Sequence, residues 1–146
     1  MEERMGWALA ILVAATSHLA APPVDTADVD DFRRLMFSTP LLHFAVAAER
    51  QLPPQFDWTT DWCSAPMIGS TGRSFDFTLP CRRHDFAYRN AKRLPGEWTA
   101  PKRRRIDEQF RRDMIVTCST RPIDQKVTCR SWAEVFFRAV RIAGGP

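Results

Sequence analysis

The stretch CRRHDFAYRN at residues 81–90 decides the fold and carries the densest chemistry of the chain. Its pattern predicts a helix over 81–93, ended by the Leu-Pro-Gly turn at 94–96. Successive residues on a helix point about 100° apart, so His84 and Asp85 address different neighbours. A histidine beside an acid, followed by aromatic residues, is a candidate for catalysis or for metal binding.

The four cysteines of the chain contain no C-x-x-C pair, which argues against a zinc ribbon or a thioredoxin-type site. An even number of cysteines with other spacing is typical of disulfides. Four cysteines allow three connectivities. We favour pairing of sequence neighbours, which closes the shortest loops and joins Cys63 to Cys81 and Cys118 to Cys129.

The segment FDWTTDWC at residues 56–63 supplies a second carboxylate. If its cysteine bonds the one that begins the 81–93 helix, Asp61 lies near the start of that helix. Asp61 and Asp85 can then share a hard cation with main-chain carbonyls and water, and such oxygen ligands suit Ca²⁺. Each acid also has an ordinary interpretation: Asp61 as an Asx turn or helix cap, and Asp85 as a surface i,i+4 partner of Arg89.

A histidine that acts as a general base works best when a carboxylate orients its other ring nitrogen. The helix expected over residues 101–118 offers Asp107, which shares a face with the apolar residues three and seven positions later. A carboxylate on an apolar face needs a partner, and His84 is the candidate. Asp113 is the competing acid, and we favour Asp107. The other histidine of this part of the chain, His43, is expected to be an ordinary core or surface residue.

The remaining pattern is helical, with no internal repeat and no alternating strand pattern. The sequence therefore predicts an all-α domain held by disulfides, with a long loop of the kind that is usually functional or tethered. Thr39 is expected to be an N-cap, with Pro40 as the first helical residue. The further helices are expected over residues 28–37, 40–50 and 131–143, and the loops over residues 55–80 and 119–128.

Residues 1–21 predict a secretory signal peptide, because the apolar run WALAILVAA at 7–15 is too short to span a bilayer and small residues follow it. We expect residues 22–146 to form a single domain. The formal net charge of the whole chain is +4, which suggests an anionic partner, either a nucleic-acid backbone or a lipid headgroup. Lys and Arg concentrate at residues 91–112.

Three separate segments carry a resemblance to a known family. They are residues 56–63, residues 81–90 and Arg105-Ile106-Asp107, and they occur in that family's order. Over about residues 56–118 the chain closely resembles the secreted phospholipase A2 enzymes of bacteria and fungi. The resemblance implies a small α-helical fold with two disulfides in the pairing favoured above, and with a long calcium-binding loop.

The resemblance also implies roles for individual residues. It implies His84 as the general base and Asp107 as its orienting partner. It implies Ca²⁺ held by the carboxylates of Asp61 and Asp85 and by the main-chain carbonyl of Trp62. The activity implied is hydrolysis of the sn-2 ester of glycerophospholipids by a secreted enzyme, which we expect to act as a monomer on a membrane or micelle surface and not on nucleic acid.

The strongest alternative is a non-enzymatic, membrane-active or toxin-like binding module, which would not need Asp61, Asp85 and Asp107 together. A nuclease would use the basic charge, but the chain resembles no nuclease motif. A serine hydrolase is disfavoured because no G-x-S-x-G occurs. The basic run at residues 102–105 is either a solvated helix face or a docking site for an anionic surface. Two tryptophans, Trp58 and Trp98, are open to insertion at a lipid surface or to burial in the core.

Overall fold

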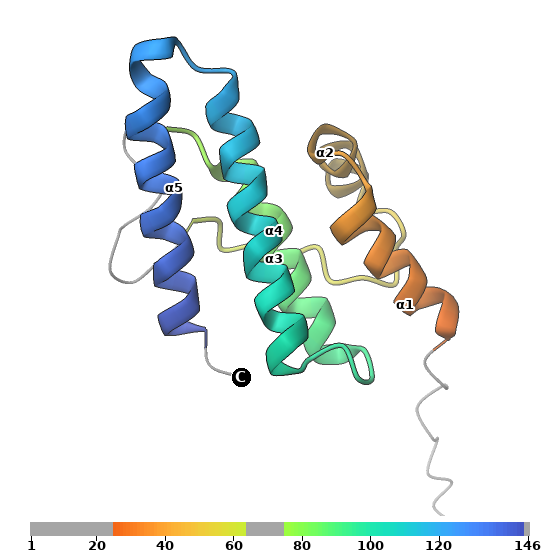
Figure 1. Ribbon diagram of the computed structural model, residues 1–146. Helices are drawn as coiled ribbons and strands as arrows, with labels where there is room; N and C mark the ends of the chain where they lie inside the picture. Colours follow the sequence, from red (N-terminus) through yellow and green to blue (C-terminus); the bar gives the residue numbers. More distant parts are fainter. Residues whose placement is uncertain (1–24, 64–74, 145–146) are drawn as a thin grey trace, which may run out of the picture.

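The computed structural model describes residues 25–63 and 75–144, and this part of the chain is helical with no β-strand, as the sequence predicts. α4 and α5 lie side by side and antiparallel, and α3 packs against α4 (Figure 1). α1 and α2 lie on the side of the α3–α4 pair that is away from α5. None of the described helices is long and apolar enough to cross a membrane. The predicted signal peptide lies outside the described residues, and so do residues 64–74 of the predicted long loop. The elements are α1 (Thr26–Arg33), the π-helical η1 (Arg34–Ser38), α2 (Leu41–Arg50), α3 (Thr78–Arg93), α4 (Ala100–Ser119) and α5 (Ile123–Ala143).

Side-chain caps begin two of the helices. The Asp25 carboxylate accepts a hydrogen bond from the Ala27 amide at 3.1 Å and begins α1. The Thr99 hydroxyl accepts from the Lys102 amide at 3.4 Å and begins α4. These caps satisfy amides that have no partner within the helix.

Two helix starts differ from the predictions by a few residues. α2 begins at Leu41 with Pro40 as its N-cap, because the amide and hydroxyl of Thr39 both donate to the Arg34 carbonyl and end η1 instead. α3 begins at Thr78, three residues before the predicted start. The early start is compatible with Pro80, since a proline in the first helical turn costs no hydrogen bond.

The start of α5 was predicted wrongly. This helix begins at Ile123, eight residues before the predicted position, and the loop expected over residues 119–128 shortens to a brief turn. The side chains of Ile123 and Val127 are 81% and 74% exposed, so the first turns of α5 bury no apolar face. Without such a face, apolar periodicity gives no helical signal.

Both disulfides have the pairing of sequence neighbours, Cys63 to Cys81 and Cys118 to Cys129. The first ties the segment before residue 64 to the first turn of α3, and the second ties the end of α4 to α5. Two apolar clusters flank α3. One, under α1 and α2, is rich in aromatic rings and includes Phe32, Phe44, Phe56, Trp58 and Phe86. The other lies between α3, α4 and α5 and includes the four half-cystines, Phe77, Phe110, Met114 and Phe136.

A buried ion pair joins α3 to α4. Arg83 and Asp113 are 2% and 3% exposed, and their two hydrogen bonds measure 2.8 and 2.5 Å. Arg83 also donates to the Thr39 carbonyl at 2.6 Å, which fastens the end of η1 to α3. Asp113, the competing candidate for the histidine's partner, is therefore engaged in a structural contact.

Replacing Asp113 with Ala should lower the free energy of unfolding by about 3–5 kcal/mol, because it leaves the Arg83 guanidinium buried and without its counter-charge. The measurement is chemical denaturation at neutral pH. Glu108→Ala is the matched control on the same helix, since its pair with Arg104 is solvent-exposed and should contribute less than about 1 kcal/mol. Equal losses in the two variants would contradict a stabilising role for the buried pair.

Candidate active site

His84 and Asp107 face each other across the contact between α3 and α4. His84 Nε2 lies 2.9 Å from Asp107 Oδ1, and the two side chains are 9% and 0% exposed. The imidazole is packed between two aromatic rings, with centroid distances of 4.3 Å to Tyr88 and 4.6 Å to Phe110. An ionised carboxylate only accepts hydrogen bonds, so this contact puts the imidazole proton on Nε2 and leaves Nδ1 as the acceptor of the neutral ring.

Asp107 holds its charge inside the fold because several donors surround it. Burial alone would raise the pKa of this carboxyl group, but the hydrogen bonds from His84, Tyr88 and Arg141 outweigh burial and hold the pKa below its ordinary value. The Tyr88 hydroxyl donates at 2.6 Å and Arg141 Nη1 at 2.7 Å. Burial, and then the hydrogen bond to Asp107, raise the pKa of Tyr88, which keeps the phenol neutral as a donor.

Sequence reasoning missed most of these partners. Arg103, whose Nε lies 3.6 Å from Asp107 Oδ2, precedes Asp107 by four residues, and Tyr88 follows His84 by four. Helical spacing is therefore a signal that could have found both. Arg141 has no comparable signal, because it reaches Asp107 from the far end of another helix.

A pocket of about 570 Å³ opens beside His84. α3 forms one wall, with His84, Asp85 and Lys92 among its residues, and the second half of α5 forms the other. The α5 wall is apolar and includes Phe136 and Ile142. The oriented ring of His84 therefore lies on a polar wall that faces an apolar wall, which suits an amphiphilic ligand.

The segment before the Cys63–Cys81 disulfide lies against the polar wall. Asp85 Oδ2 accepts hydrogen bonds from the Thr60 hydroxyl at 2.5 Å and from the Asp61 amide at 3.1 Å. The Asp61 carboxylate lies 3.4 Å from Arg89 Nη2. Trp62 adopts a left-handed backbone conformation with φ 62°, and its side chain is 47% exposed.

Electrostatics set Asp85 apart from an ordinary surface acid. Burial raises its pKa to about 6; the Thr60 hydrogen bond opposes this rise and the nearby Asp61 charge adds to it. Within residues 25–63 and 75–144, no group of three or more His, Cys, Asp or Glu could hold a metal ion. A cation site here would therefore rest on two carboxylates together with main-chain oxygens.

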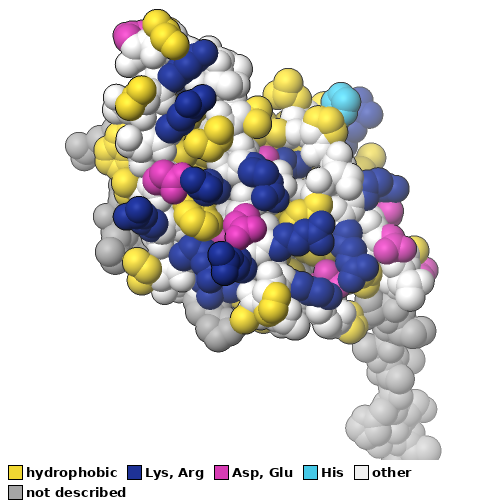
Figure 2. Space-filling view, viewed as in Figure 1, with side chains coloured by type: hydrophobic (Ala, Val, Ile, Leu, Met, Phe, Trp, Pro, Cys, Tyr) yellow, Lys and Arg dark blue, Asp and Glu magenta, His cyan; other side chains and the backbone are white. Residues whose placement is uncertain are grey.

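The basic run at residues 102–105 is largely engaged in internal contacts. Arg103 is buried, Lys102 pairs with Glu97 at 2.7 Å and Arg104 pairs with Glu108 at 3.0 Å. Lys and Arg side chains gather over α4 and α5 with acidic residues among them (Figure 2). Most charges of this run are therefore balanced locally and do not form one open cationic patch.

The two tryptophans differ in burial. Trp58 is 8% exposed and packs against Phe86 at 4.5 Å between ring centroids, so it belongs to the core. Trp98 is half-buried against Tyr88, with the Lys92 ammonium 4.9 Å from its ring.

His43, the other histidine of the described part, lies exposed on α2, away from the pocket.

Comparison with known proteins gives the family. The model of the family described as prokaryotic phospholipase A2 matches residues 32–144, which include the three motif segments and all four cysteines. The chain belongs to the prokaryotic phospholipase A2 family. A protein of Beauveria bassiana named secretory phospholipase A2 is 34% identical over 137 residues, covering 94% of this chain and 68% of the relative. A protein of Arthroderma benhamiae with the same name is 36% identical, covering 93% of this chain and 95% of the relative.

Membership of the prokaryotic phospholipase A2 family makes this chain a lipid-hydrolysing enzyme of the phospholipase A2 type. The match extends through α5, whose second half forms the apolar wall of the pocket and whose last turn carries Arg141. A non-enzymatic binding module, the main alternative from sequence, is therefore set aside.

Proposed function

We propose that this phospholipase A2 hydrolyses the sn-2 ester of glycerophospholipids in a calcium-dependent reaction and releases a fatty acid and a lysophospholipid. The observation that carries the proposal is the 2.9 Å contact of His84 Nε2 with Asp107 Oδ1 beside a pocket with one apolar wall. This arrangement leaves Nδ1 as the only proton acceptor of the ring.

His84 acts as the general base. Its Nδ1 takes a proton from a water molecule as the water attacks the ester carbonyl carbon. The ring then carries a positive charge, which the ionised Asp107 stabilises through Nε2. His84 returns the proton to the leaving sn-2 alkoxide of the glycerol backbone, so the ring is neutral again at the end of the cycle.

The proposed calcium ligands are the carboxylates of Asp61 and Asp85 and the main-chain carbonyl of Trp62. Their chemistry fits a hard divalent cation, because all are oxygen donors and two are acidic. The raised pKa of Asp85 reflects burial together with the Asp61 charge, and a cation beside the two carboxylates would offset both. When bound, Ca²⁺ supplies positive charge for the substrate phosphate and for the developing oxyanion.

The pocket walls suit the two ends of a phospholipid. Ile142, on the apolar wall, is 76% exposed, and Trp62 lies exposed near the opposite wall. Arg89 and Lys92 line the α3 wall and complement an anionic phosphate. We therefore propose a phospholipid membrane or micelle surface as the partner of this face.

Secretion is part of the proposal. The two relatives are named secretory, the N-terminal 21 residues have the pattern of a signal peptide, and two disulfides are typical of an oxidising compartment.

The function is tested with phosphatidylcholine vesicles, by measuring released fatty acid in calcium and in excess chelator. We expect fatty acid and lysophospholipid in calcium, release from the sn-2 position, and a loss of at least about 100-fold in chelator, since a metal ion contributes several kcal/mol to stabilisation of the transition state. Undiminished hydrolysis in chelator would contradict the calcium requirement. Vesicle binding without any fatty acid would contradict the enzymatic function itself.

A further inference from the structure

Charged and polar groups from three helices surround the Asp107 carboxylate. From α3, His84 Nε2 lies at 2.9 Å and Tyr88 Oη at 2.6 Å, both from Oδ1. From α5, Arg141 Nη1 lies 2.7 Å from Oδ2, and from α4 itself Arg103 Nε lies 3.6 Å from the same oxygen. Oδ1 therefore accepts the hydrogen bonds from His84 and Tyr88, while Oδ2 faces the two arginines.

Arg141 does not line the pocket, although its helix neighbours at positions 139, 140, 142, 143 and 144 do. Within residues 25–63 and 75–144, its side chain is linked to the reaction centre through Asp107 Oδ2. A carboxylate held through one oxygen can turn about its Cβ–Cγ bond, and a donor on the second oxygen fixes its plane. His84 Nε2 then donates to a carboxylate oxygen whose orientation is fixed, as a preorganised catalytic pair requires.

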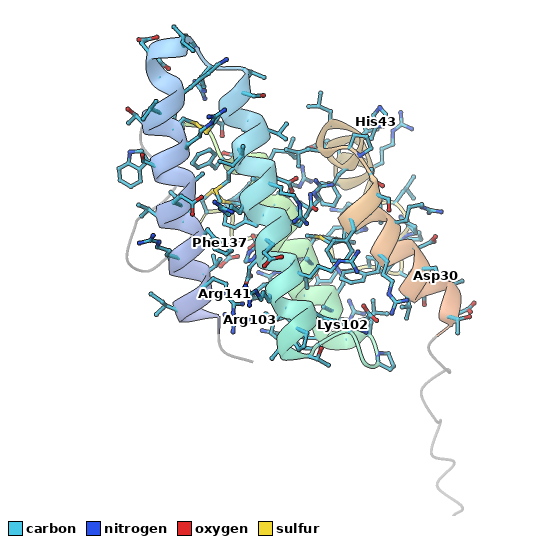
Figure 3. The ribbon with its side chains drawn as sticks, in the orientation of Figure 1. Asp30, His43, Lys102, Arg103, Phe137 and Arg141 are labelled. Atoms are coloured by element: carbon cyan, nitrogen blue, oxygen red, sulfur yellow. A yellow bond between two sulfur atoms is a disulfide. The ribbon has the colours of Figure 1, made fainter. Side chains whose placement is uncertain are left out.

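Arg103 holds the end of α5 in the position that Arg141 needs. Its side chain is 9% exposed, and its Nη2 donates to the carbonyls of Val140 at 3.1 Å and Arg141 at 2.9 Å. The Val140 carbonyl also accepts from the Gly144 amide at 3.0 Å, whereas the Arg141 carbonyl belongs to the last turn of α5, where intrahelical donors run out. Its Nε donates to Tyr88 Oη at 3.1 Å. Arg103 and Arg141 come together at neighbouring ends of α4 and α5 (Figure 3).

Gly144, the residue that caps the end of α5, lies close to Tyr88. A Cβ atom built on Gly144 would lie 2.8 Å from Tyr88 Oη and 2.9 Å from the Val140 carbonyl oxygen. Only a residue without a side chain lets the end of α5 pass this close to Tyr88. The close approach links the last turn of α5 to the hydroxyl that donates to Asp107.

We propose that Arg141, held by Arg103, is a positioning residue that orients Asp107 for its work on His84. This inference rests on the proposed function and deepens it, because it adds the last turn of α5 to the catalytic machinery. The charged and titratable groups that face Asp107 are His84 and Tyr88 from α3, Arg103 from α4 and Arg141 from α5. Arg141 supplies the charged donor at 2.7 Å, so its loss should both free the carboxylate to turn and favour its protonation.

The test compares Arg141→Met, Arg141→Lys and Arg141→Gln in the calcium-loaded enzyme. We expect the Met variant to lose about 10–100-fold in kcat, the range seen when a residue that orients a functional ligand is removed. KM should stay within about twofold, because Arg141 does not touch the pocket. The acidic limb of the pH profile of kcat/KM should move to higher pH. The Lys variant keeps a charged donor and should recover most of kcat.

Arg138→Met is the matched control, because Arg138 is exposed on the same helix one turn earlier, and we expect parental kcat. If the Met variant does not fold, the Gln variant carries the test and should show a lowered kcat at parental KM. A parental kcat in the Met or Gln variant would overturn the positioning role. So would a loss of kcat that Lys fails to restore and that leaves the pH profile unmoved.

The proposed function is tested separately by His84→Ala in the same assay. An inactive His84→Ala variant beside a fully active Arg141→Met variant would overturn the positioning role alone. An active His84→Ala variant would overturn the proposed function, and the role of Arg141 with it.

Discussion

Replacing His84 with Ala is expected to reduce kcat/KM by about 10²–10⁴-fold, the contribution typical of a positioned general base. The variant loses the imidazole that lines the pocket and whose Nδ1 is the proposed proton acceptor, while the proposed calcium ligands remain. The measurement is the initial rate of fatty-acid release from phosphatidylcholine vesicles in saturating calcium. The affinity of the protein for calcium should change little, since no proposed ligand is removed.

Stability is a second readout of the same variant. His84→Ala removes a hydrogen bond to Asp107 and packing against Tyr88 and Phe110, so it should also unfold more easily. Asp107 keeps Tyr88 and Arg141 as donors, which limits the damage. Circular dichroism at the assay temperature separates lost chemistry from lost folding.

His43→Ala is the matched control. This histidine is exposed on α2 and does not line the pocket, so its removal should leave the rate unchanged. A folded His84→Ala variant that retains the parental rate would contradict the general-base assignment. A loss of rate in the His43 variant would show that the assay reports something other than the pocket.

Local signals explain which parts of the fold the sequence predicts well. Residues 81–93 lie wholly within α3, because apolar residues recur there at helical spacing beside the core. The cysteine pairing follows from the short loops that neighbouring cysteines close, and the structure contains that pairing. The first turns of α5 escape prediction because the side chains of Ile123 and Val127 are largely exposed.

Long-range contacts explain which parts of the site escape prediction. Asp107 is identifiable from its place on an apolar face, since a buried carboxylate needs partners. The identity of the partners depends on which helix ends meet in space. Arg103 belongs to a basic run that would ordinarily be solvated, yet it is buried against Tyr88 and the end of α5. Arg141 stands 34 residues from Asp107 and gives no local signal.

Asp85→Asn is expected to have opposite effects on activity and on stability. The change keeps the shape of the side chain and an oxygen that can accept from Thr60 and Asp61, but it removes the charge proposed to bind calcium. We expect calcium affinity to fall on the order of 100-fold, because ligand charge is a main determinant of calcium affinity. The rate at a calcium concentration that just saturates the parent should fall accordingly, and isothermal titration measures the affinity.

The stability effect has the other sign. Burial raises the pKa of Asp85 to about 6, so the folded state holds this proton more tightly than the unfolded state does. The stabilising contribution of the protonated group is present at low pH and is lost as the pH rises through about 6. Without calcium at pH 8, Asp85→Asn should therefore be more stable than the parent by about 1–2 kcal/mol after solvent screening. The advantage should vanish near pH 4.

Calcium should reverse this order at pH 8, because it binds and stabilises the folded parent while the variant gains little. Thermal unfolding at pH 4 and pH 8, with calcium or with chelator, measures each term. Asp30→Asn, at an exposed acid on α1, is the control and should follow the parent in all four conditions. If the calcium-induced rise in Tm is the same in the Asp85 variant as in the parent, Asp85 is not a calcium ligand.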